Sequence, residues 1–314
     1  MAINYTSRAT PRGDLGEVIK EYSTSGYNFI AEQILPVRPV ALKAANLSVL
    51  QRENLKREDA AHSNGAAFNR INLKAEDTSY ACVDYGLEIG LTDDDRASYD
   101  TDFDAEVESV QLIADKIALE QEYRVASAIF NTTTWTGASL YTDNSGSPWD
   151  TVTTNIITQV VAAKEKVRAN TGMSADTMII GAATLNNILK NTAILARFPG
   201  NTIISEEVLR SNLASIFGLQ NLLVGNAVYD GAKDGQSFSG SDVWSDDYAM
   251  VCKVNTGSVK SGGLGRTLVW TPMDEAGVVQ YREEQTESDI FRVRQYQQEK
   301  VFDASFGHLM KIDV

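Results

Sequence analysis

Histidine and cysteine are scarce in this sequence of 314 residues, which holds only two of each. Cys82 and Cys252 lie far apart in apolar, strand-like surroundings and form no CxxC motif, so two buried thiols are expected rather than a disulfide. His62 and His308 have no second ligand at metal spacing. We therefore expect neither zinc chemistry nor histidine-based acid–base catalysis, and no cofactor.

Long hydrophobic runs are also missing. No stretch approaches 18 apolar residues, so no membrane-spanning helix is expected. The first eight residues lack the apolar segment of a signal peptide, which predicts a protein that acts where it is made.

Positive charge is in deficit, since 28 Lys and Arg residues stand against 42 Asp and Glu residues and the formal net charge is −14. Phosphate backbones are held by clusters of Lys and Arg, so this balance argues against a nucleic-acid-binding surface. It is compatible with a container for DNA, whose inner wall should not adhere to its contents.

Motifs that carry catalysis are weak or absent. The stretch Gly262–Gly265 neither follows a clear buried strand nor opens a helix, and no Lys-Ser/Thr follows it, so a loop between strands is favoured over a phosphate loop. The run Asp93–Asp95 lacks the spaced ligands and the glycine of a calcium loop, which favours a solvated approach to a helix. There is no G-x-S-x-G motif, and no spacing singles out a catalytic carboxylate pair. We therefore expect that the protein is not an enzyme.

The chain is long enough for one large domain or two modest ones, each with its own core. Residues 1–30 are polar and without period, which predicts either a disordered tail or an arm that becomes ordered on a neighbouring molecule. In the apolar stretch 30–40 that follows, Pro36 and Pro39 predict extended backbone rather than a helix.

Residues 43–74 predict a long hairpin. The stretch 47–55 is strand-like, 59–67 is small and turn-prone, and 68–74 alternates again. The hairpin has too few apolar residues to bury a face of its own, and an isolated two-stranded hairpin is marginal in water. We infer that it rests on another subunit.

A strand pair or bent strand over 78–91 leads to the longest predicted helix, about 102–130, which Thr101 or Asp102 can cap. It would span roughly 40 Å at 1.5 Å per residue. Two apolar stripes are predicted along it. They consist of Phe103, Val107, Val110, Ala114 and Ile117, and of Leu112, Leu119, Tyr123, Ala126 and Phe130.

Strands and helices alternate in the middle of the chain, which predicts a compact α/β domain at about 150–265. The strands of the C-terminal part are expected to pack beside the long helix, so that both ends of the chain build one domain. Helices are expected at 152–169, 183–196 and 205–217. Strands are expected at 177–180, 222–224, 248–254, 267–270, 277–281 and 289–296. An exposed loop is expected at 230–242, and a tail at 301–310.

Charge is unevenly distributed. Residues 43–74 carry six basic and three acidic residues, a net of +3, whereas residues 93–122 carry eleven acidic and two basic residues, a net of −9. Both segments can be solvated faces. Alternatively, the basic hairpin of one subunit lies over acidic surface of the next, and complementary charge sets the register. On that hypothesis the contact residues are Arg52, Lys56, Arg57, Arg70 and Lys74 with Asp102, Asp104, Glu106 and Glu108.

The order of these parts resembles the major capsid proteins of tailed bacteriophages, whose fold also occurs in encapsulins. The resemblance covers nearly the whole chain. It rests on Ile34–Val40 before the hairpin, Thr78–Leu87 and Leu91–Asp94 after it, Leu223–Tyr229 with Val243–Trp244, and the ending Phe302–Leu309. No single stretch is diagnostic, but their order, with a long helix after the hairpin, is specific.

The resemblance implies an α+β fold in four parts. Residues 1–42 would be an N-terminal arm and lead-in, and residues 43–77 would be an extended hairpin loop that reaches neighbouring subunits. Residues 78–150 with 266–314 would form a peripheral domain that holds the long helix. Residues 151–265 would form an axial domain whose loops, such as 230–242, point at the centre of pentamers and hexamers.

The implied function is structural: self-assembly into an icosahedral shell that encloses a DNA genome without sequence-specific binding. The implied partners are copies of the chain in hexamers and pentamers, a separate scaffolding protein, a portal and a decoration protein. The implied location is the virion capsid, after assembly in the host cytoplasm. Two alternatives stay open: an encapsulin-type compartment and an acidic cytosolic α/β hydrolase. No motif supports a crosslink through Lys56 or Lys74.

Overall fold

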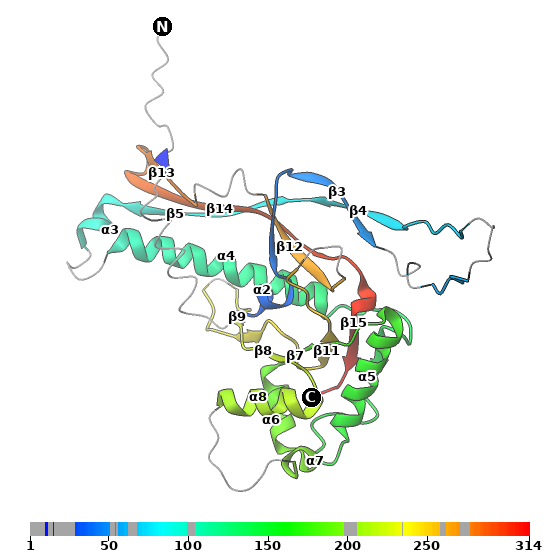
Figure 1. The fold of residues 1–314 in the computed structure, drawn as a ribbon. Helices are drawn as coiled ribbons and strands as arrows, with labels where there is room; N and C mark the ends of the chain where they lie inside the picture. The colour runs from blue at the N-terminus through cyan, green and yellow to red at the C-terminus, as the bar shows by residue number, and fades with distance from the viewer. Residues whose placement is uncertain are drawn as a thin grey trace.

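The computed structural model describes residues 10–11, 15, 29–50, 54, 56–61, 68–98, 104–197, 206–233, 235–257, 262–270 and 277–314. Two larger β-sheets dominate it, with a long helix beside the first and shorter helices around the second (Figure 1). A hairpin leaves the first sheet and extends away from the rest of the molecule. The predicted α+β class is confirmed.

The first sheet has six strands in the order β1-β13-β14-β12-β2, and β5 joins it by pairing with β14. β14 is its centre, because β13 pairs with its first half, β12 with its second half and β5 with residues 288–297. The strands predicted in the C-terminal part are present. The sheet consists of β1 (Thr10–Pro11), β2 (Val37–Val40), β5 (Val83–Thr92), β12 (Gly265–Trp270), β13 (Val278–Glu283) and β14 (Ser288–Val301).

The longest helix, α4 (Ala105–Ile129), covers one face of this sheet. It begins later than predicted, because the side chain of Asp104 caps it by accepting hydrogen bonds from the backbone N–H groups of Glu106 and Val107. The two predicted caps, Thr101 and Asp102, lie outside the described residues. The short helix α3 (Asp93–Ser98) precedes α4.

The first half of α4 packs on the six-stranded sheet. Val110, Ile113 and Ile117 form a buried cluster with Leu91 and Phe291. The second predicted stripe is wrong at two positions, since Leu112 is 48% and Tyr123 45% exposed. Helical periodicity alone could not show that the sheet covers only one side of α4.

The second sheet has the order β6-β15-β11-β7-β8 and is buried on both faces. Along β7 the side chains of Met178 and Ile180 face the surrounding helices, while Ile179 faces the end of α4. Its strands are β6 (Tyr141–Asp143), β7 (Thr177–Gly181), β8 (Asn221–Gly225), β11 (Tyr248–Cys252) and β15 (Gly307–Lys311). The helices are α5 (Ile156–Thr171), α6 (Ala182–Lys190), α7 (Thr192–Leu195) and α8 (Glu206–Phe217).

The strand β15, in the predicted tail 301–310, lies in the second sheet rather than the first, although its Leu309 shares a buried cluster with Val125 and Ile129 of α4. This strand pairs with β11, in the register Met250↔Leu309, and β6 pairs with β15. Both strands therefore belong to the sheet of the middle segment, although they lie in the ranges predicted for the peripheral domain. Period-two alternation reveals a strand but not its partner. A 3-10 turn, η4 (Ala304–Phe306), connects β14 to β15.

Three smaller differences have local causes. The predicted helix 183–196 is two helices, because Asn191 ends α6 and its side chain accepts hydrogen bonds from the N–H groups of Ala193 and Ile194 at the start of α7. A four-residue helix, α2 (Ala31–Ile34), fits between residue 30 and Pro36. The segment 230–242, predicted as a loop, has a strand at each end, β9 (Val228–Asp230) and β10 (Gly240–Asp242).

The hairpin is confirmed, but its strands lie nearer its base than predicted. β3 (Ala44–Leu50) pairs with β4 (Ala75–Ala81), whereas residues 68–74, predicted as a strand, are described without regular secondary structure. Both cysteines are buried and free, as expected. Among the described residues, no helix has the length and apolarity that crossing a bilayer requires.

A buried carboxylate joins the N-terminal lead-in to both sheets. Glu122 on α4 accepts hydrogen bonds from the backbone N–H groups of Ile30 (3.0 Å) and Ala31 (2.8 Å) and from the indole Nε1 of Trp244 (2.6 Å). Burial raises the pKa of Glu122, and these donors act in the opposite direction. Nothing in the sequence pattern indicated this contact.

His308 on β15 is also fully buried. Its Nδ1 lies 3.0 Å from the carbonyl oxygen of Ser139, which can only accept, so Nδ1 carries the hydrogen. Nε2 then accepts from the hydroxyl of Thr142 at 2.8 Å, and that hydroxyl accepts from the Lys166 ammonium at 2.7 Å. Burial, with a smaller contribution from Lys166, lowers the pKa of His308 to about 4.

The substitution Glu122→Gln should destabilise the subunit by about 2–4 kcal/mol, because one oxygen that accepts hydrogen bonds becomes an amide donor facing other donors. Urea unfolding followed by tryptophan fluorescence measures the change. The matched control is Glu120→Gln on the same helix, whose side chain is 60% exposed and whose loss should change stability by less than about 0.5 kcal/mol. Equal effects of the two substitutions would contradict the assigned role of Glu122.

The subunit should lose stability as the pH falls from about 6.5 toward 4. The pKa of His308 is about 4 in the folded state and about 6.5 in the unfolded chain, so below pH 6.5 the unfolded state binds the extra proton. Between pH 7 and 4.5 this amounts to about 2 kcal/mol. His308→Asn should flatten the dependence by that amount in urea titrations at several pH values. An unchanged slope would refute the assignment.

Candidate assembly surfaces

Residues 43–77 form an arm whose base is anchored on the first sheet; we call this segment the hairpin arm. β3 and β4 pair from Ala44↔Ala81 to Leu50↔Ala75. Beside them, Tyr80 packs in a small buried cluster with Val40, Leu268 and Tyr296. The base is therefore fixed in direction relative to the sheet.

Beyond its base, the hairpin arm is held together by asparagine side chains rather than by a strand ladder. The Asn54 amide donates to the Lys74 carbonyl at 2.7 Å and accepts from the Lys74 N–H at 2.9 Å. Farther out, Asn69 donates to the carbonyl of Asp59 at 2.9 Å. These contacts keep the two sides of the arm together but bury no apolar surface.

Three large apolar side chains near the end of the arm are exposed. Phe68, Ile71 and Leu73 are each 77% exposed. Full burial of such a side chain contributes about 1.5–3 kcal/mol of stabilising free energy. Because these side chains are exposed, the single chain does not gain most of this stabilisation. An apolar patch on a projecting segment is typical of a surface that binds another molecule.

The basic residues predicted as contacts are exposed along the arm where the structure describes them. Lys56, Arg57, Arg70 and Lys74 are exposed, and Arg52 lies outside the described residues. Lys56 forms an ion pair with Glu58 at 3.7 Å between two well-exposed side chains, which contributes little to stability. Their role between subunits stays a prediction.

Two of the four acidic residues predicted as contacts have roles within the chain. Asp104 caps α4, and Glu106 pairs with Arg96 at 2.8 Å. Glu108 is exposed, and Asp102 lies outside the described residues. Inter-subunit contacts at these positions stay a prediction.

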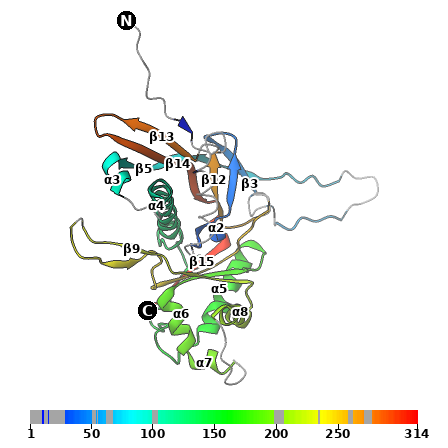
Figure 2. The ribbon, with the colours of Figure 1, turned by 90° about the vertical axis from the view of Figure 1, so that its left-hand side faces the viewer.

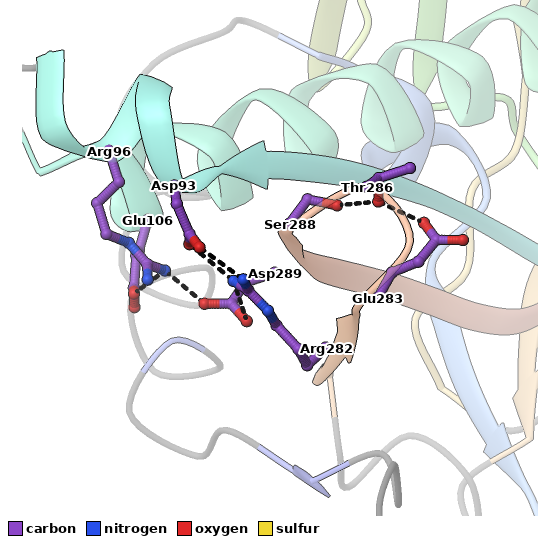
Figure 3. A network of polar contacts seen from close by, with 8 residues as sticks. All are labelled: Asp93, Arg96, Glu106, Arg282, Glu283, Thr286, Ser288 and Asp289. Carbon is purple, nitrogen blue, oxygen red and sulfur yellow. Dashed lines mark hydrogen bonds and ion pairs between the residues drawn. The ribbon is translucent and has the colours of Figure 1, made fainter.

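Asp93, the first residue of the acidic run 93–95, is part of an ion-pair network (Figure 3). The Arg282 guanidinium binds both carboxylate oxygens of Asp93 at 2.7 and 2.6 Å, which holds the pKa of Asp93 below its usual value. Asp289 links the two halves, because it pairs with Arg96 at 2.8 Å and with Arg282 at 3.6 Å. The network joins α3 and the start of α4 to β13 and β14.

No group of three or more His, Cys, Asp or Glu side chains in the described part of the chain could hold a metal ion. The glycine-rich stretch 262–265 leads directly into β12, as a loop between strands would. Gly262, with φ 76°, adopts the left-handed conformation that glycine tolerates best.

A cavity of about 530 Å³ lies between α4, β5 and the β9–β10 hairpin; we call it the side cavity. Its lining is mostly apolar and aromatic. The rings of Tyr123 and Tyr229 meet edge to face with 5.7 Å between their centroids, and Arg124 stacks 3.7 Å from the centroid of Tyr85. Nothing in the sequence indicated this cavity, because Tyr229 and Val243 of its lining are 105 or more residues away from the lining residues of α4 and β5.

The hairpin arm and the side cavity lie on opposite sides of the molecule. Figure 2 shows the arm leaving on one side and the β9–β10 hairpin on the other, and the side cavity lies beside the β9–β10 hairpin. A single copy therefore presents an exposed apolar projection on one side and an apolar hollow on the other.

No family profile matches this chain. Among curated proteins, the chain is 22% identical over 219 residues to the major capsid protein of Burkholderia phage BcepMu, a match that covers 69% of this chain and 68% of the relative.

Solved structures match over nearly the whole length. A phage-related protein from Bordetella bronchiseptica has a TM-score of 0.73 at 18% identity and covers 97% of this chain and 98% of its own. The capsid protein of cyanophage P-SCSP1u has a TM-score of 0.60 at 12% identity, covering 88% and 85%. The SrpI encapsulin from Synechococcus elongatus has a TM-score of 0.53 at 10% identity, covering 93% and 89%.

These matches confirm the resemblance that the sequence indicated. The chain therefore has the α+β fold of phage capsid proteins, which encapsulins share.

Proposed function

We propose that this chain is the major shell subunit of a tailed bacteriophage, a structural protein that assembles into an icosahedral shell around a DNA genome. The observation that carries the proposal is the hairpin arm, which is anchored at its base and exposes apolar side chains at its far end. Such a segment gains its stabilising contacts only from other molecules. The fold shared with phage capsid proteins supports copies of the same chain as those molecules.

The curated relative favours a phage shell over the encapsulin-type compartment, because that relative is a phage major capsid protein. The same comparison, together with the absence of any catalytic motif in the sequence, favours a purely structural role over the hydrolase alternative. On this proposal the chain forms pentamers and hexamers in the virion capsid. Its assembly takes place in the host cytoplasm and involves a scaffolding protein, a portal and a decoration protein.

The proposed domain roles follow from the same assignment. Residues 1–42 and the hairpin arm would contact neighbouring subunits. The six-stranded sheet with α4 would form the peripheral domain. The second sheet with its helices would form the axial domain near the centre of each capsomer. Each contact in such a lattice can be weak, because a subunit already held by one neighbour meets the next at high effective concentration.

Charge is consistent with this proposal. A net charge of −14 per copy opposes assembly at long range. At physiological ionic strength the Debye length is about 8 Å, so copies repel one another only weakly until their surfaces are close. At that distance the basic hairpin arm can meet acidic surface of another copy, which sets register more than affinity.

Purified protein should form closed icosahedral particles when its concentration is raised or when it is expressed with its scaffolding partner. Negative-stain electron microscopy and analytical ultracentrifugation detect them. A protein that stays monomeric under both conditions would refute the proposed function.

Reversing two charges on the arm, Arg52→Glu with Arg57→Glu, should reduce the yield of particles by about tenfold or more and leave the subunit folded, because like charges would then meet across the contact. The control, Lys190→Glu with Arg197→Glu, makes the same change in net charge at exposed positions near α6 and α7, away from the arm. Circular dichroism reports folding, and sedimentation reports assembly. Normal particle yield from the arm variant would exclude the electrostatic hypothesis.

A further inference from the structure

We propose that the first sheet carries a binding site for a phosphate group, formed by Arg38, Arg266 and Lys300 on the face turned away from α4. We call these three side chains the cation row. The inference goes beyond the proposed function and does not depend on it, because the whole site lies within one subunit.

Alternation along β14 separates the two faces of the first sheet. Phe291 packs in the buried cluster with α4, and Glu299 binds Arg124 of α4 at 2.8 Å, so the odd-numbered residues of β14 face that helix (Figure 1). Its even-numbered residues face the other way, where Tyr296 packs with Leu268 of β12. The cation row lies on this second face.

The cation row spans three neighbouring strands. Arg266 of β12 lies directly opposite Lys300 of β14 in the antiparallel pair. Arg38 of β2 is paired with Leu268, which follows two residues after Arg266 on the same side of the sheet. Like charges in directly opposite positions are destabilising, so this placement costs free energy unless an anion compensates it.

The neighbouring cations of this face have carboxylate partners, whereas the cation row has none in the described part of the chain. Arg292 pairs with Glu88 at 2.8 Å, and Arg294 pairs with Asp84 at 4.0 Å. None of the ion pairs formed between described residues includes a member of the cation row. Three cations on adjacent strands are therefore left without a counter-charge from these residues, in a chain whose net charge is −14.

Arg266 is the least exposed member of the cation row, at 5%. Its Nη2 donates a hydrogen bond to the neutral carbonyl group of Gly257 at 2.7 Å. Burial, and to a smaller extent the charge of Arg38, lower the pKa of Arg266, so its surroundings disfavour the charge that it carries. A charge buried to this degree normally pairs with an opposite charge. The cation row therefore has the character of an anion site.

A phosphate group fits this charge better than a carboxylate does. It carries about −1.5 to −2 charges at pH 7 and offers three strong acceptor oxygens, whereas a carboxylate carries a single charge. Guanidinium groups bind phosphate bidentately, and an ammonium group binds it as a point charge. Arg38 and Lys300 are half-buried on the strands either side of β12, so both can meet a ligand that comes from solvent. The Lys300 ammonium donates one hydrogen bond to the Ser79 carbonyl oxygen and has two further N–H groups.

The site would link the N-terminal lead-in to the sheet. β2 carries Arg38 and leads through residues 41–43 into β3, the first strand of the hairpin arm. A phosphate group held by Arg38 and Arg266 would fasten β2 to β12, in addition to the parallel pairing of these strands. Binding is therefore expected to stabilise the folded subunit.

Thermal unfolding of the purified full chain tests the site. Sodium phosphate should raise the midpoint by about 3–6 °C relative to sodium chloride of the same ionic strength, because a ligand that binds only the folded state stabilises it. Arg38→Gln and Arg266→Met should each abolish most of this rise. The matched control is Lys190→Gln, which removes one positive charge at an exposed position on α6 and should keep the rise. Sedimentation in each buffer excludes a change in association as its cause.

Two outcomes would overturn the inference. An equal rise in the wild type, both site variants and the control would be a general salt effect on stability. No rise in the wild type would show that the cation row does not bind phosphate, as expected if carboxylates of another molecule compensate it instead. If Arg266→Met does not fold, Arg38→Gln decides the question, because Arg38 is only half-buried. Neither outcome bears on the proposed function, which particle formation tests separately.

Isothermal titration calorimetry gives a second readout and identifies the source of the group. Phosphate should bind the wild type at one site per chain and bind Arg38→Gln about tenfold or more weakly, because charge-assisted hydrogen bonds are lost. Equal affinity for the two proteins would contradict the assignment. A short DNA duplex that competes with phosphate would identify DNA as the source, and a duplex that does not compete would identify the free ion; the site stands in both cases.

Discussion

The carboxylate of Glu122 joins three parts of the chain that are remote in sequence. It binds the first residues of the lead-in through the N–H groups of Ile30 and Ala31, and it binds Trp244 beside the second sheet, while its own helix lies on the first sheet. A buried carboxylate is tolerated only where hydrogen bonds satisfy it, so these three parts must meet in one arrangement. The direction of the hairpin arm depends on that arrangement, because α2, β2 and β3 follow one another along the chain and β2 is fixed by pairing with β12.

Helix α4 extends this constraint over the whole molecule. Its first half packs on the six-stranded sheet through Ile113 and Ile117, and its second half packs on the other sheet through Val125 and Ile129. One rigid element therefore contributes to both cores. The exposed side of the same helix forms a wall of the side cavity. Folding of the body and the shape of its outer surfaces are thus coupled through a single helix.

Burial divides the described residues into a body that buries many apolar side chains and an arm that leaves large ones exposed. The body buries its apolar residues between sheets and helices, whereas Phe68, Ile71 and Leu73 stay exposed. Ordering such an arm costs conformational entropy that only an intermolecular contact can offset. On the proposed function this division suits a lattice, because contacts that are weak singly hold a subunit once several form together.

Local sequence signals determined much of the fold. Alternation and turn residues revealed the hairpin, and apolar periodicity revealed α4 and α5. Gly172 and Gly218, with φ of 74° and 65°, end α5 and α8 in the left-handed conformation that glycine tolerates best. These features depend on neighbours a few residues apart, which a single sequence displays. The same local reasoning identified the basic residues of the arm.

Only the tertiary structure decided which segments meet. Nothing in the alternation of residues 307–311 says that they pair with β11 rather than with the strands beside α4, because strand pairing depends on contacts far along the chain. The same holds for Glu122, which in sequence is one acid among many, and for Tyr123, whose periodicity predicts the core although it lines an open cavity. The sequence by itself determined the elements and the arm; the packing of distant segments determined the sheets, the buried carboxylate and the side cavity.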